Sequence, residues 1–497
     1  MLPQQGWKKM LSERMREIQG RIFIGGEWRE SAHGRDLPVV DPASGQEFAR
    51  IAAAGADDMA LAVDAAVGAM AKARHGGWNP ADRQNALLRL ADAIAARSEE
   101  FARIEMHDTG KPISNILHLD VPQSAAGLRY FAGWAAHLTG ETMNLSVPGN
   151  WHAATLREPV GVAGQIIPWN YPLMGAAMKI GPAIAAGCAV VLKPAEQTSL
   201  SALLLADLLA DCGFPAGMVN IVTGTGAEAG AALVRHEGVA KIAFTGSTAT
   251  GREILRVAGP MMKRVTVELG GKSPVVVMPD ADLDKAAAAI AMGIFFNSGQ
   301  TCSAGSRLLV HADVARDLVP RVAQIAAGMR IGAPDDPATQ LGPVISQAQC
   351  DRIMGFITRA RADGARIVTG GERRGQAGYF IVPTVLDDVQ AAMEIAREEV
   401  FGPVLAVQTF DTLDLDEIAA LANDGTYGLA AYVWTSSMSS AFGLVRRIRA
   451  GTVRVNTAGG NDFCMPAGGV KQSGNGRENG RAGVEAYTEL KAMTIAV

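Results

Sequence analysis

The sequence of 497 residues has no long apolar run, no block of basic residues and no paired cysteines. Its longest nearly apolar stretch, 183–192, is much shorter than the roughly 20 residues that a membrane-spanning helix needs. Residues 1–20 are polar and charged, which predicts an N-terminal lead helix or extension over 1–19 rather than a secretory signal or a membrane anchor. Because no Lys/Arg patch is interleaved with aromatic residues, neither nucleic acid nor a membrane is expected as a partner.

Cysteine and histidine are few, and neither occurs with metal-binding spacing. The five cysteines form an odd set without paired spacing: Cys188, Cys212, Cys302, Cys350 and Cys464. This usage predicts reduced thiols and a cytoplasmic protein rather than a disulfide scaffold. Since the eight histidines form no His-x-x-x-His pair, a metal site is not expected. A charged fraction of 19% and a formal net charge of −4 are typical of an ordinary globular protein.

Strand-like and helix-like segments alternate from about residue 158 onwards. The expected strands are 160–167, 188–192, 219–222, 241–244 and 265–267, and the expected helices are 174–186, 199–212 and 227–235. A second alternating region begins at 274–278 with a helix over 283–296, and the tail 487–497 is strand-like and suited to edge addition to another subunit. This order predicts an α/β fold with parallel sheets covered by helices, which bind ligands at the carboxyl ends of their strands.

Cys302 and Glu268 are the strongest candidates for chemistry. A single cysteine is more often an inert core residue, but Cys302 lies among Gly299 and polar neighbours that are not typical of a core. Glu268 precedes two glycines and has apolar flanks, so a merely solvated role is improbable. Together they predict covalent oxidation, in which the sulfur attacks first and the carboxylate then helps water to attack. Cys464 is the rival thiol.

Three strand-end turns suit a dinucleotide. Lys193 and Glu196 can bind the two hydroxyls of a ribose, and a carboxylate there would repel a 2′-phosphate, which favours NAD over NADP; the alternative is a solvated turn. The run 224–230 resembles a dinucleotide fingerprint, but its third glycine comes one residue late. The turn 244–251 suits a phosphate at a helix N-terminus, and an N-cap by Ser247 or Thr248 explains it equally well.

Two further turns can serve the reacting groups. Asn170, in the run 168–172, can donate its neutral side-chain amide to a developing oxyanion; the alternative is a proline-bracketed turn packed by aromatics. Glu399 and Phe401, in the run 398–403, can approach a ribose and a nicotinamide; the alternative is the entry to an edge strand.

In this order, the motifs resemble the NAD(P)-dependent aldehyde dehydrogenase superfamily of the hydrolytic, non-acylating type. The resemblance extends over about 22–491 and rests on the segments 168–172, 193–198, 244–251, 267–274, 297–302 and 399–403, supported by 468–474. It implies that Cys302 is the nucleophile, Glu268 the general base, and Asn170 the oxyanion donor beside the Cys302 backbone amide. Some activation of the Cys302 thiol is expected, because an ordinary thiol has a pKa of about 8.5.

The resemblance also implies the cofactor contacts and the domains. The expected NAD-binding residues are Ile166, Pro168, Trp169, Lys193, Glu196, Gly226, Gly230, Thr245, Gly246, Ser247, Leu269, Glu399 and Phe401. Two Rossmann-like parallel-sheet domains and a small β extension for a dimer or homotetramer are expected: NAD-binding 20–138 and 160–269, catalytic 270–474, and oligomerisation 139–159 and 475–497.

Departures from the family pattern concern the substrate tunnel. Its expected lining is Met174, Met178, Phe296, Thr301, Ser303, Asn461 and Ala467. Met178 stands where many relatives carry tryptophan, Ala467 replaces the usual phenylalanine, and the loop 457–465 lacks the aromatics that many members place there. We therefore expect a wider, partly polar tunnel for a bulky or functionalised aldehyde, and disfavour betaine aldehyde, which needs an aromatic box.

Three other functions compete with this interpretation. A CoA-acylating aldehyde dehydrogenase would not need Glu268, and a catalytically idle binding or structural homologue should have lost Cys302, Glu268 or Asn170. A cysteine hydrolase would need a partner histidine, but the nearest in sequence, His311, lies on a predicted strand.

Overall fold

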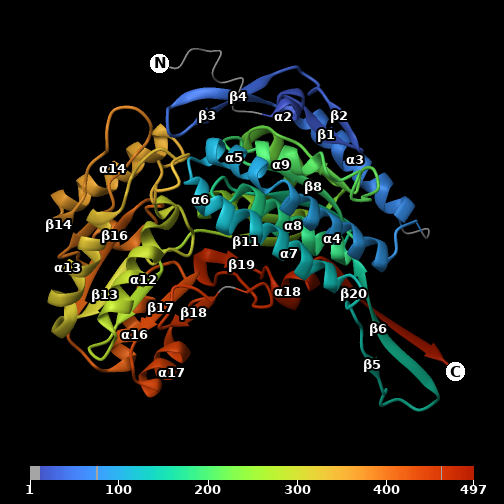
Figure 1. Ribbon diagram of the computed structural model, residues 1–497. Coiled ribbons are helices and arrows are strands. Elements are labelled where there is room, and N and C mark those ends of the chain that lie inside the picture. Colours follow the sequence, from blue (N-terminus) through green and yellow to red (C-terminus); the bar gives the residue numbers. More distant parts are fainter. Residues whose placement is uncertain (1–11, 74–76, 461) are drawn as a thin grey trace.

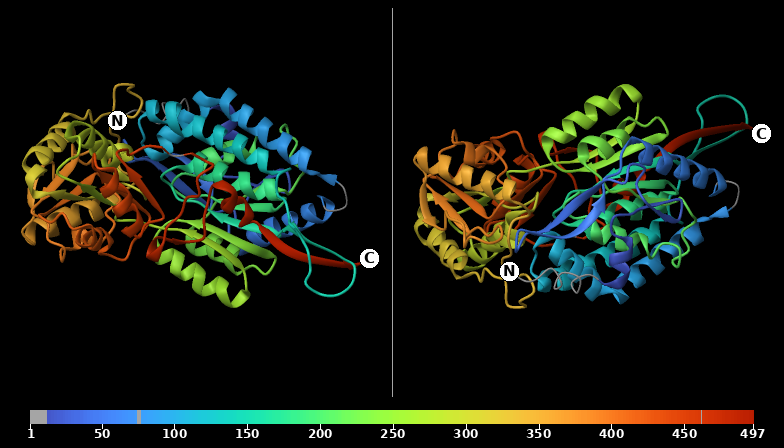
Figure 2. Two further views of the ribbon diagram at one scale, coloured as in Figure 1. Left: turned by 90° about the horizontal axis from the view of Figure 1, so that it is seen from below. Right: turned by 90° about the horizontal axis from the view of Figure 1, so that it is seen from above.

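The computed structural model describes residues 12–73, 77–460 and 462–497, which form two α/β lobes and a protruding arm (Figure 1). Each lobe has its own large sheet with helices packed around it, and the arm projects from the first lobe on the side away from the second (Figure 2). The expected α/β class with parallel sheets is confirmed. Within the described residues, none of the helices combines the length and the apolarity that crossing a bilayer requires.

The first lobe is built on an eight-stranded sheet of order β19-β11-β10-β7-β8-β9-β1-β2. Its strands are β1 (Ile22–Ile24), β2 (Glu27–Arg29), β7 (Val162–Ile166), β8 (Ala189–Lys193), β9 (Val219–Ile221), β10 (Val239–Thr245), β11 (Arg264–Glu268) and β19 (Gly474–Asn475). The five central strands are parallel, so their carboxyl ends share one edge. β1, β2 and β19 pair antiparallel at the margins.

The helices of this lobe follow the strand–helix alternation of the sequence. They are α2 (Glu13–Ile18), α3 (Ala56–Lys72), α4 (Pro80–Ala96), α5 (Ser98–Thr109), α6 (Ile113–Asn115), α7 (Val121–Trp134), α8 (Pro172–Ala186), α9 (Leu200–Ala206), α10 (Ala231–Arg235), α11 (Thr248–Ala258) and α18 (Gly480–Glu485). Only α2 of the expected lead helix can be compared, because 1–11 lie outside the described residues.

The second lobe is built on a seven-stranded sheet of order β14-β15-β16-β13-β12-β17-β18. Its strands are β12 (Pro274–Val277), β13 (Arg307–His311), β14 (Arg366–Thr369), β15 (Thr384–Asp387), β16 (Val404–Phe410), β17 (Ala430–Trp434) and β18 (Thr452–Val455), and its helices are α12 (Leu283–Phe295), α13 (Ala312–Gly328), α14 (Gln347–Ala362), α15 (Glu394–Arg397), α16 (Leu415–Asn423) and α17 (Met438–Arg447). All neighbouring strands are parallel except β14, which pairs antiparallel with β15.

The arm is a three-stranded antiparallel sheet of order β20-β6-β5. Its strands are β5 (Thr142–Met143), β6 (Trp151–Pro159) and the C-terminal β20 (Thr488–Ala496). A separate two-stranded sheet joins β3 (Asp36–Asp41) to β4 (Gln46–Ala52). The predicted terminal strand is therefore present, and it occupies one edge of the arm.

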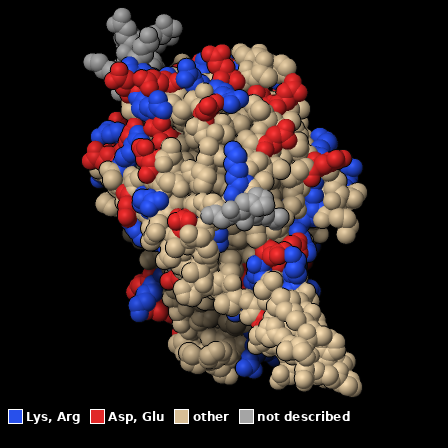
Figure 3. All heavy atoms as spheres, turned by 90° about the vertical axis from the view of Figure 1, so that its right-hand side faces the viewer, with Lys and Arg blue, Asp and Glu red and all other residues tan. Residues whose placement is uncertain are grey.

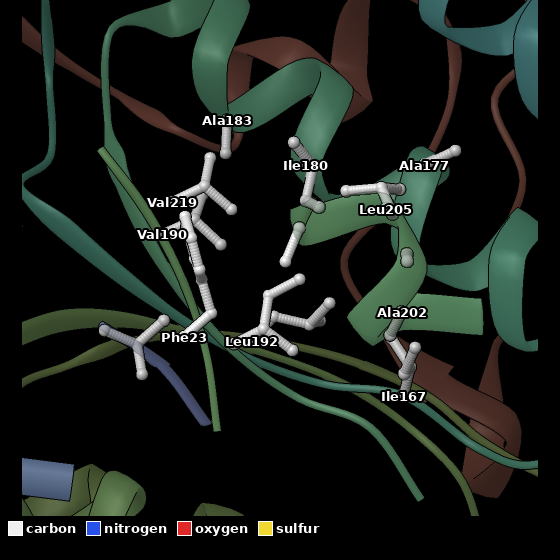
Figure 4. Packing of buried hydrophobic residues seen from close by; sticks show 14 of the residues in the cluster. Phe23, Ile167, Ala177, Ile180, Ala183, Val190, Leu192, Ala202, Leu205 and Val219 are labelled. Carbon is white, nitrogen blue, oxygen red and sulfur yellow. The ribbon is translucent and has the colours of Figure 1, made fainter. Parts of the chain in front are cut away.

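Small residues bring α8 close to the first sheet and to α7. Ile180 and Ala183 of α8 face Val190 and Leu192 of β8 in the buried core (Figure 4). A Cβ on Gly181 would lie only 2.8 Å from Phe131, so α7 and α8 also approach closely there. Since α8 begins at Pro172, this packing fixes the preceding turn that carries Asn170.

Two expected helices differ in their details. The helix expected over 199–212 ends at Ala206, because the following residues form tighter i to i+3 bonds such as Leu209 N–H to the Ala206 carbonyl. Leu208 and Leu209 nevertheless remain buried, which is why their periodicity was helical. The helix expected over 227–235 begins with a π-helical turn, Gly226–Gly230, before α10.

Candidate active site

The strand ends of the first sheet bring most of the predicted residues to one edge. Glu268 is the last residue of β11 and pairs with Thr245 at the end of β10. Lys193 is the last residue of β8. The neighbouring strand β7 leads into the turn that carries Asn170. Because these strands are parallel neighbours, residues far apart in sequence face the same space. The second lobe supplies Cys302 to it.

The backbone before Cys302 has an unusual conformation that several bonds fix in place. Asn297, Ser298 and Gly299 adopt left-handed φ values of 52°, 54° and 71°, a region that non-glycine residues enter at a cost. The Ser298 hydroxyl donates to the Gly342 carbonyl at 2.7 Å. Gln300 accepts on its side-chain oxygen from Ile345 N–H at 2.9 Å. The loop is therefore rigidly held, as positioning of a nucleophile requires.

Asn170 connects the first lobe to this loop. Its side-chain Nδ2 donates to the Gln300 carbonyl at 2.8 Å, and Asn297 Nδ2 donates to the Asn170 carbonyl at 3.3 Å. An amide nitrogen carries two hydrogens, so one of them stays available for an oxygen bound beside Cys302. The predicted oxyanion donor and the predicted nucleophile are thus brought together.

The Cys302 thiol is half-buried, and its pKa is raised rather than lowered. The removal of water from around the thiolate is the main cause, and the negative charges of Glu399 and Glu268 add to it, giving a pKa of about 12. Burial and these charges oppose formation of the thiolate, and the expected activation of the thiol stays a prediction.

Glu268 is 8% exposed and lies in a cradle made by glycines of the 468–474 segment. Its Oε2 accepts from Gly469 N–H at 3.2 Å, while Oε1 has no hydrogen-bond partner among the described residues. A Cβ on Gly468 would lie 2.4 Å from Oε1, so only glycine leaves room for this carboxylate. Burial raises its pKa well above the ordinary value, Glu478 raises it further, and Lys179 opposes this.

The residues predicted to bind the adenosine and the phosphates form two groups. Lys193 Nζ pairs with Glu196 Oε2 at 3.0 Å, and a Cβ on Gly230 would lie 3.9 Å from Ile166 and 4.0 Å from Lys193. These residues are therefore neighbours, as a shared nucleotide contact requires. Gly226 faces open space at the start of its turn.

The turn at the end of β10 begins α11. The Ser247 hydroxyl caps this helix by accepting from Thr250 N–H at 3.2 Å, and its contact with a phosphate stays a prediction. Gly246 N–H donates to the Glu268 carbonyl at 3.0 Å, which leaves that amide unavailable to a phosphate. The Thr245 hydroxyl is buried without a partner among the described residues, and a phosphate oxygen would satisfy it.

The residues predicted to approach the nicotinamide and its ribose lie between the two lobes. Glu399 Oε1 accepts from Gly271 N–H at 3.0 Å, and Leu269 N–H donates to the Ser473 carbonyl at 2.9 Å. The rings of Phe401 and Trp169 meet edge to face with centroids 5.2 Å apart. Trp169 directly follows Pro168 in the chain. Burial raises the pKa of Glu399 to about 7.

The predicted tunnel residues are only partly brought together. A Cβ on Gly127 of α7 would lie 1.9 Å from Met178 and 3.3 Å from Phe463, whose ring is 6.3 Å from that of Tyr130. Met178, Phe463 and Tyr130 therefore lie near one another, and the loop supplies one aromatic ring to this group. The remaining predicted lining residues are half-buried, namely Met174, Phe296, Thr301, Ser303 and Ala467. Asn461 lies outside the described residues.

Comparisons with known proteins agree with this geometry. The sequence model of the aldehyde dehydrogenase family matches residues 28–493. The chain belongs to the aldehyde dehydrogenase family.

Individual members of the family are similar over almost their whole length. The mitochondrial aldehyde dehydrogenase of Homo sapiens is 44% identical over 483 residues, covering 96% of this chain and 92% of its own. The mitochondrial benzaldehyde dehydrogenase of Antirrhinum majus is 43% identical, covering 96% and 89%. The NAD+ complex of aldehyde dehydrogenase from Bacillus cereus has a TM-score of 0.95 and 40% identity, covering 98% of each chain.

Some residues of this aldehyde dehydrogenase site escaped the sequence interpretation. Tyr171 donates to or accepts from the Thr301 hydroxyl at 2.9 Å, and Lys111 Nζ lies 3.6 Å above the Tyr171 ring. Lys179 forms an ion pair with Glu478 close to Glu268. The only sequence signal was a charged or polar residue inside an otherwise apolar helix, as Lys179 is in α8.

Loss of the oxyanion donor should slow the chemical step. We expect Asn170→Ala to lower kcat about 10²- to 10³-fold, which is the usual effect of removing one such donor. Steady-state kinetics measure this, and the alkylation rate of Cys302 by iodoacetamide serves as the control for an intact loop. A change confined to KM would contradict the assigned role.

Proposed function

We propose that this aldehyde dehydrogenase uses NAD to oxidise a bulky or functionalised aldehyde to its carboxylic acid through a thioester on Cys302. The observation that carries the proposal is the Asn170–Gln300 bond, which joins the oxyanion donor of one lobe to the nucleophile loop of the other. Glu268 faces the same sulfur from the end of β11. This constellation fits aldehyde oxidation followed by hydrolysis.

The steps follow from these side chains. Cys302 Sγ bonds to the aldehyde carbon as the thiol loses its proton, and Asn170 Nδ2 donates to the resulting oxyanion. The carbon then loses hydride to become a thioester. Glu268 takes a proton from water, whose oxygen displaces the sulfur and releases the acid. The sulfur regains its proton, so the thiol is restored.

The proposed cofactor is NAD, which supplies the hydride acceptor and a positive ring near the thiol when bound. Lys193 and Glu196 would hold the adenosine ribose, Thr245 and Ser247 the phosphates, and Glu399 the second ribose. The solved structure of the related Bacillus cereus enzyme contains NAD+. Since the Glu196 carboxylate repels a 2′-phosphate, NADP should be the poorer cofactor.

The bulky-aldehyde part of the proposal rests on Met178 and Ala467. Neither side chain fills as much space as the tryptophan and phenylalanine common at these positions. The neighbouring rings of Phe463 and Tyr130 would contact an aromatic substrate. Relatives include a benzaldehyde dehydrogenase and an indole-3-acetaldehyde dehydrogenase, both named for aromatic aldehydes.

Narrowing the tunnel should reverse the substrate ranking. Because Met178 already touches the position of Gly127, a tryptophan there must extend into the tunnel. We expect Met178→Trp to lower kcat/KM for aromatic aldehydes about tenfold or more relative to acetaldehyde. Met292→Trp, at an exposed position on α12, is the matched control. If both variants behave like the wild type, Met178 does not line the tunnel.

The proposed function is tested by NAD reduction across aliphatic, aromatic and polar aldehydes, with and without CoA. The proposal predicts acid formation without CoA, a preference for the larger aldehydes and a lower kcat/KM with NADP. A strict requirement for CoA would instead establish the acylating branch. No reduction of NAD with any aldehyde would favour an idle homologue.

We also propose that the arm joins copies of the chain into a dimer or tetramer and that 270–474 acts as the catalytic domain. Among the described residues β20 is an edge strand of the arm's sheet, and apolar residues on the arm are exposed, including Val147 at 54% and Leu490 at 58%. The arm carries few charges on the face that Figure 3 shows. The five free cysteines fit the proposed cytoplasmic location.

A further inference from the structure

A basic cavity lies at the amino ends of β12, β13 and β17, outside the residues proposed for the reaction. The cavity is small and partly open to solvent. Four cations line it, namely Lys272, Arg307, Arg397 and Arg449, with one carboxylate, Asp424. Positive charge therefore prevails in the cavity.

Three donors in this lining have no partner among the described residues. They are Lys272 Nζ, Ser273 Oγ and Arg307 Nε. Their residues are 5%, 2% and 4% exposed, so bulk water does not freely replace a partner. Buried donors in native proteins are almost always hydrogen-bonded, which indicates that an acceptor belongs in this cavity.

The other polar groups nearby are already paired. Arg307 Nη2 donates to the Ala422 carbonyl at 2.8 Å, which orients the guanidinium. Asp424 forms an ion pair with Arg397 at 3.5 Å, so Arg397 partly neutralises its negative charge. Lys471 donates to the carbonyls of Asn423 and Gly425. No carboxylate of the lining therefore meets Lys272 or Ser273.

We propose that this cavity binds a small oxyanion of the phosphate or sulfate type, held by Lys272, Ser273 and Arg307. A tetrahedral oxyanion offers several acceptors in different directions, which matches an ammonium, a hydroxyl and a guanidinium N–H. Arg449 at the exposed rim adds long-range attraction. The proposal does not depend on the aldehyde chemistry.

The electrostatics of Lys272 agree with an anion-binding role for this cavity. Its pKa is lowered to about 7, mainly by burial and also by Arg307 and Arg352, whereas Glu399 and Glu398 oppose the shift. A bound anion would restore the ammonium. The same segment touches the reaction site, because Gly271 N–H holds Glu399 and a Cβ on Gly271 would lie 2.7 Å from the Cys302 carbonyl.

Isothermal titration of the full chain with inorganic phosphate, at constant ionic strength in the presence of NAD, tests the proposal. NAD keeps phosphate off the turn at Ser247. We expect saturable binding at an equimolar ratio. Lys272→Met should weaken it about tenfold or more, as loss of a charge-assisted bond does. Arg449→Gln should weaken it less, and Arg446→Gln, an exposed cation of α17 outside the lining, should not change it.

Three results would overturn the assignment. Absence of saturable binding would mean that the cavity holds only water. Equal affinity in the wild type, Lys272→Met and Arg449→Gln would place the anion elsewhere. Displacement of phosphate by an equal concentration of chloride would contradict an oxyanion site. If Lys272→Met does not fold, Ser273→Ala and Arg449→Gln carry the same comparison.

Discussion

Replacement of Cys302 by alanine is expected to abolish NAD reduction with every aldehyde that the wild type oxidises. Without the sulfur no thiohemiacetal forms, so there is no tetrahedral carbon from which hydride can be transferred to NAD. Loss of a covalent nucleophile typically lowers kcat by about 10⁴-fold or more. The fold should survive, because the loop is held by Ser298 and Gln300 rather than by the thiol.

A matched control isolates the role of this thiol. Cys464 is the exposed cysteine of the loop at 457–465, and Cys464→Ala should retain activity. Cofactor binding by the Cys302→Ala protein, measured as NAD titration, should also stay close to that of the wild type. If Cys302→Ala turns over normally, or if Cys464→Ala is the inactive variant, the assigned nucleophile is wrong.

Glu268→Gln should separate the two halves of the reaction. Hydride transfer does not use the carboxylate, so a first burst of NADH, equimolar with the enzyme, is expected to remain. Hydrolysis should then be slowed about 10²- to 10⁴-fold, the usual contribution of a general base. Rapid-mixing absorbance of NADH measures both phases.

The charge-matched control is Glu253→Gln, at an exposed position of α11. It should leave burst and steady state unchanged. A Glu268→Gln protein without a burst would mean that the carboxylate acts before hydride transfer, in activation of the thiol. A Glu268→Gln protein with normal steady-state turnover would remove the general base from the account.

The pH dependence follows from the same carboxylate. Burial raises the pKa of Glu268 well above its ordinary value, and the group works as a base only when it is deprotonated. Hydrolysis in the wild type should therefore accelerate as pH rises toward this raised pKa. Because Cys302 also has a raised pKa, of about 12, the burst rate should rise with pH as well. In Glu268→Gln, the pH dependence of hydrolysis should be lost while that of the burst remains.

The sequence predicted the strands and strand-end turns well, because short apolar runs followed by glycine or proline leave few alternatives. The motifs around Asn170, Lys193 and Glu268 could therefore be placed on one edge of a parallel sheet before the structure was known. The family match confirms the enzyme class, whereas the individual site roles remain predictions.

Features that depend on long-range contacts could not be predicted in this way. Lys179 and Glu478 are separated by 299 positions, and neither neighbourhood in sequence indicates their ion pair. The end of α9 at Ala206 was missed, since buried leucines continue the helical period beyond it. The raised pKa of Cys302 reflects the charges of Glu268 and Glu399, which only the folded chain brings to the sulfur.

The central claim is a thioester on Cys302, and peptide mapping tests it most directly. Glu268→Gln protein is mixed with NAD and an aromatic aldehyde, quenched with acid, digested and analysed by mass spectrometry. The account predicts that the peptide containing Cys302 gains the mass of the aldehyde less two hydrogens, in proportion to the NADH formed. NADH formation without this adduct, or with the adduct on another residue, would contradict it.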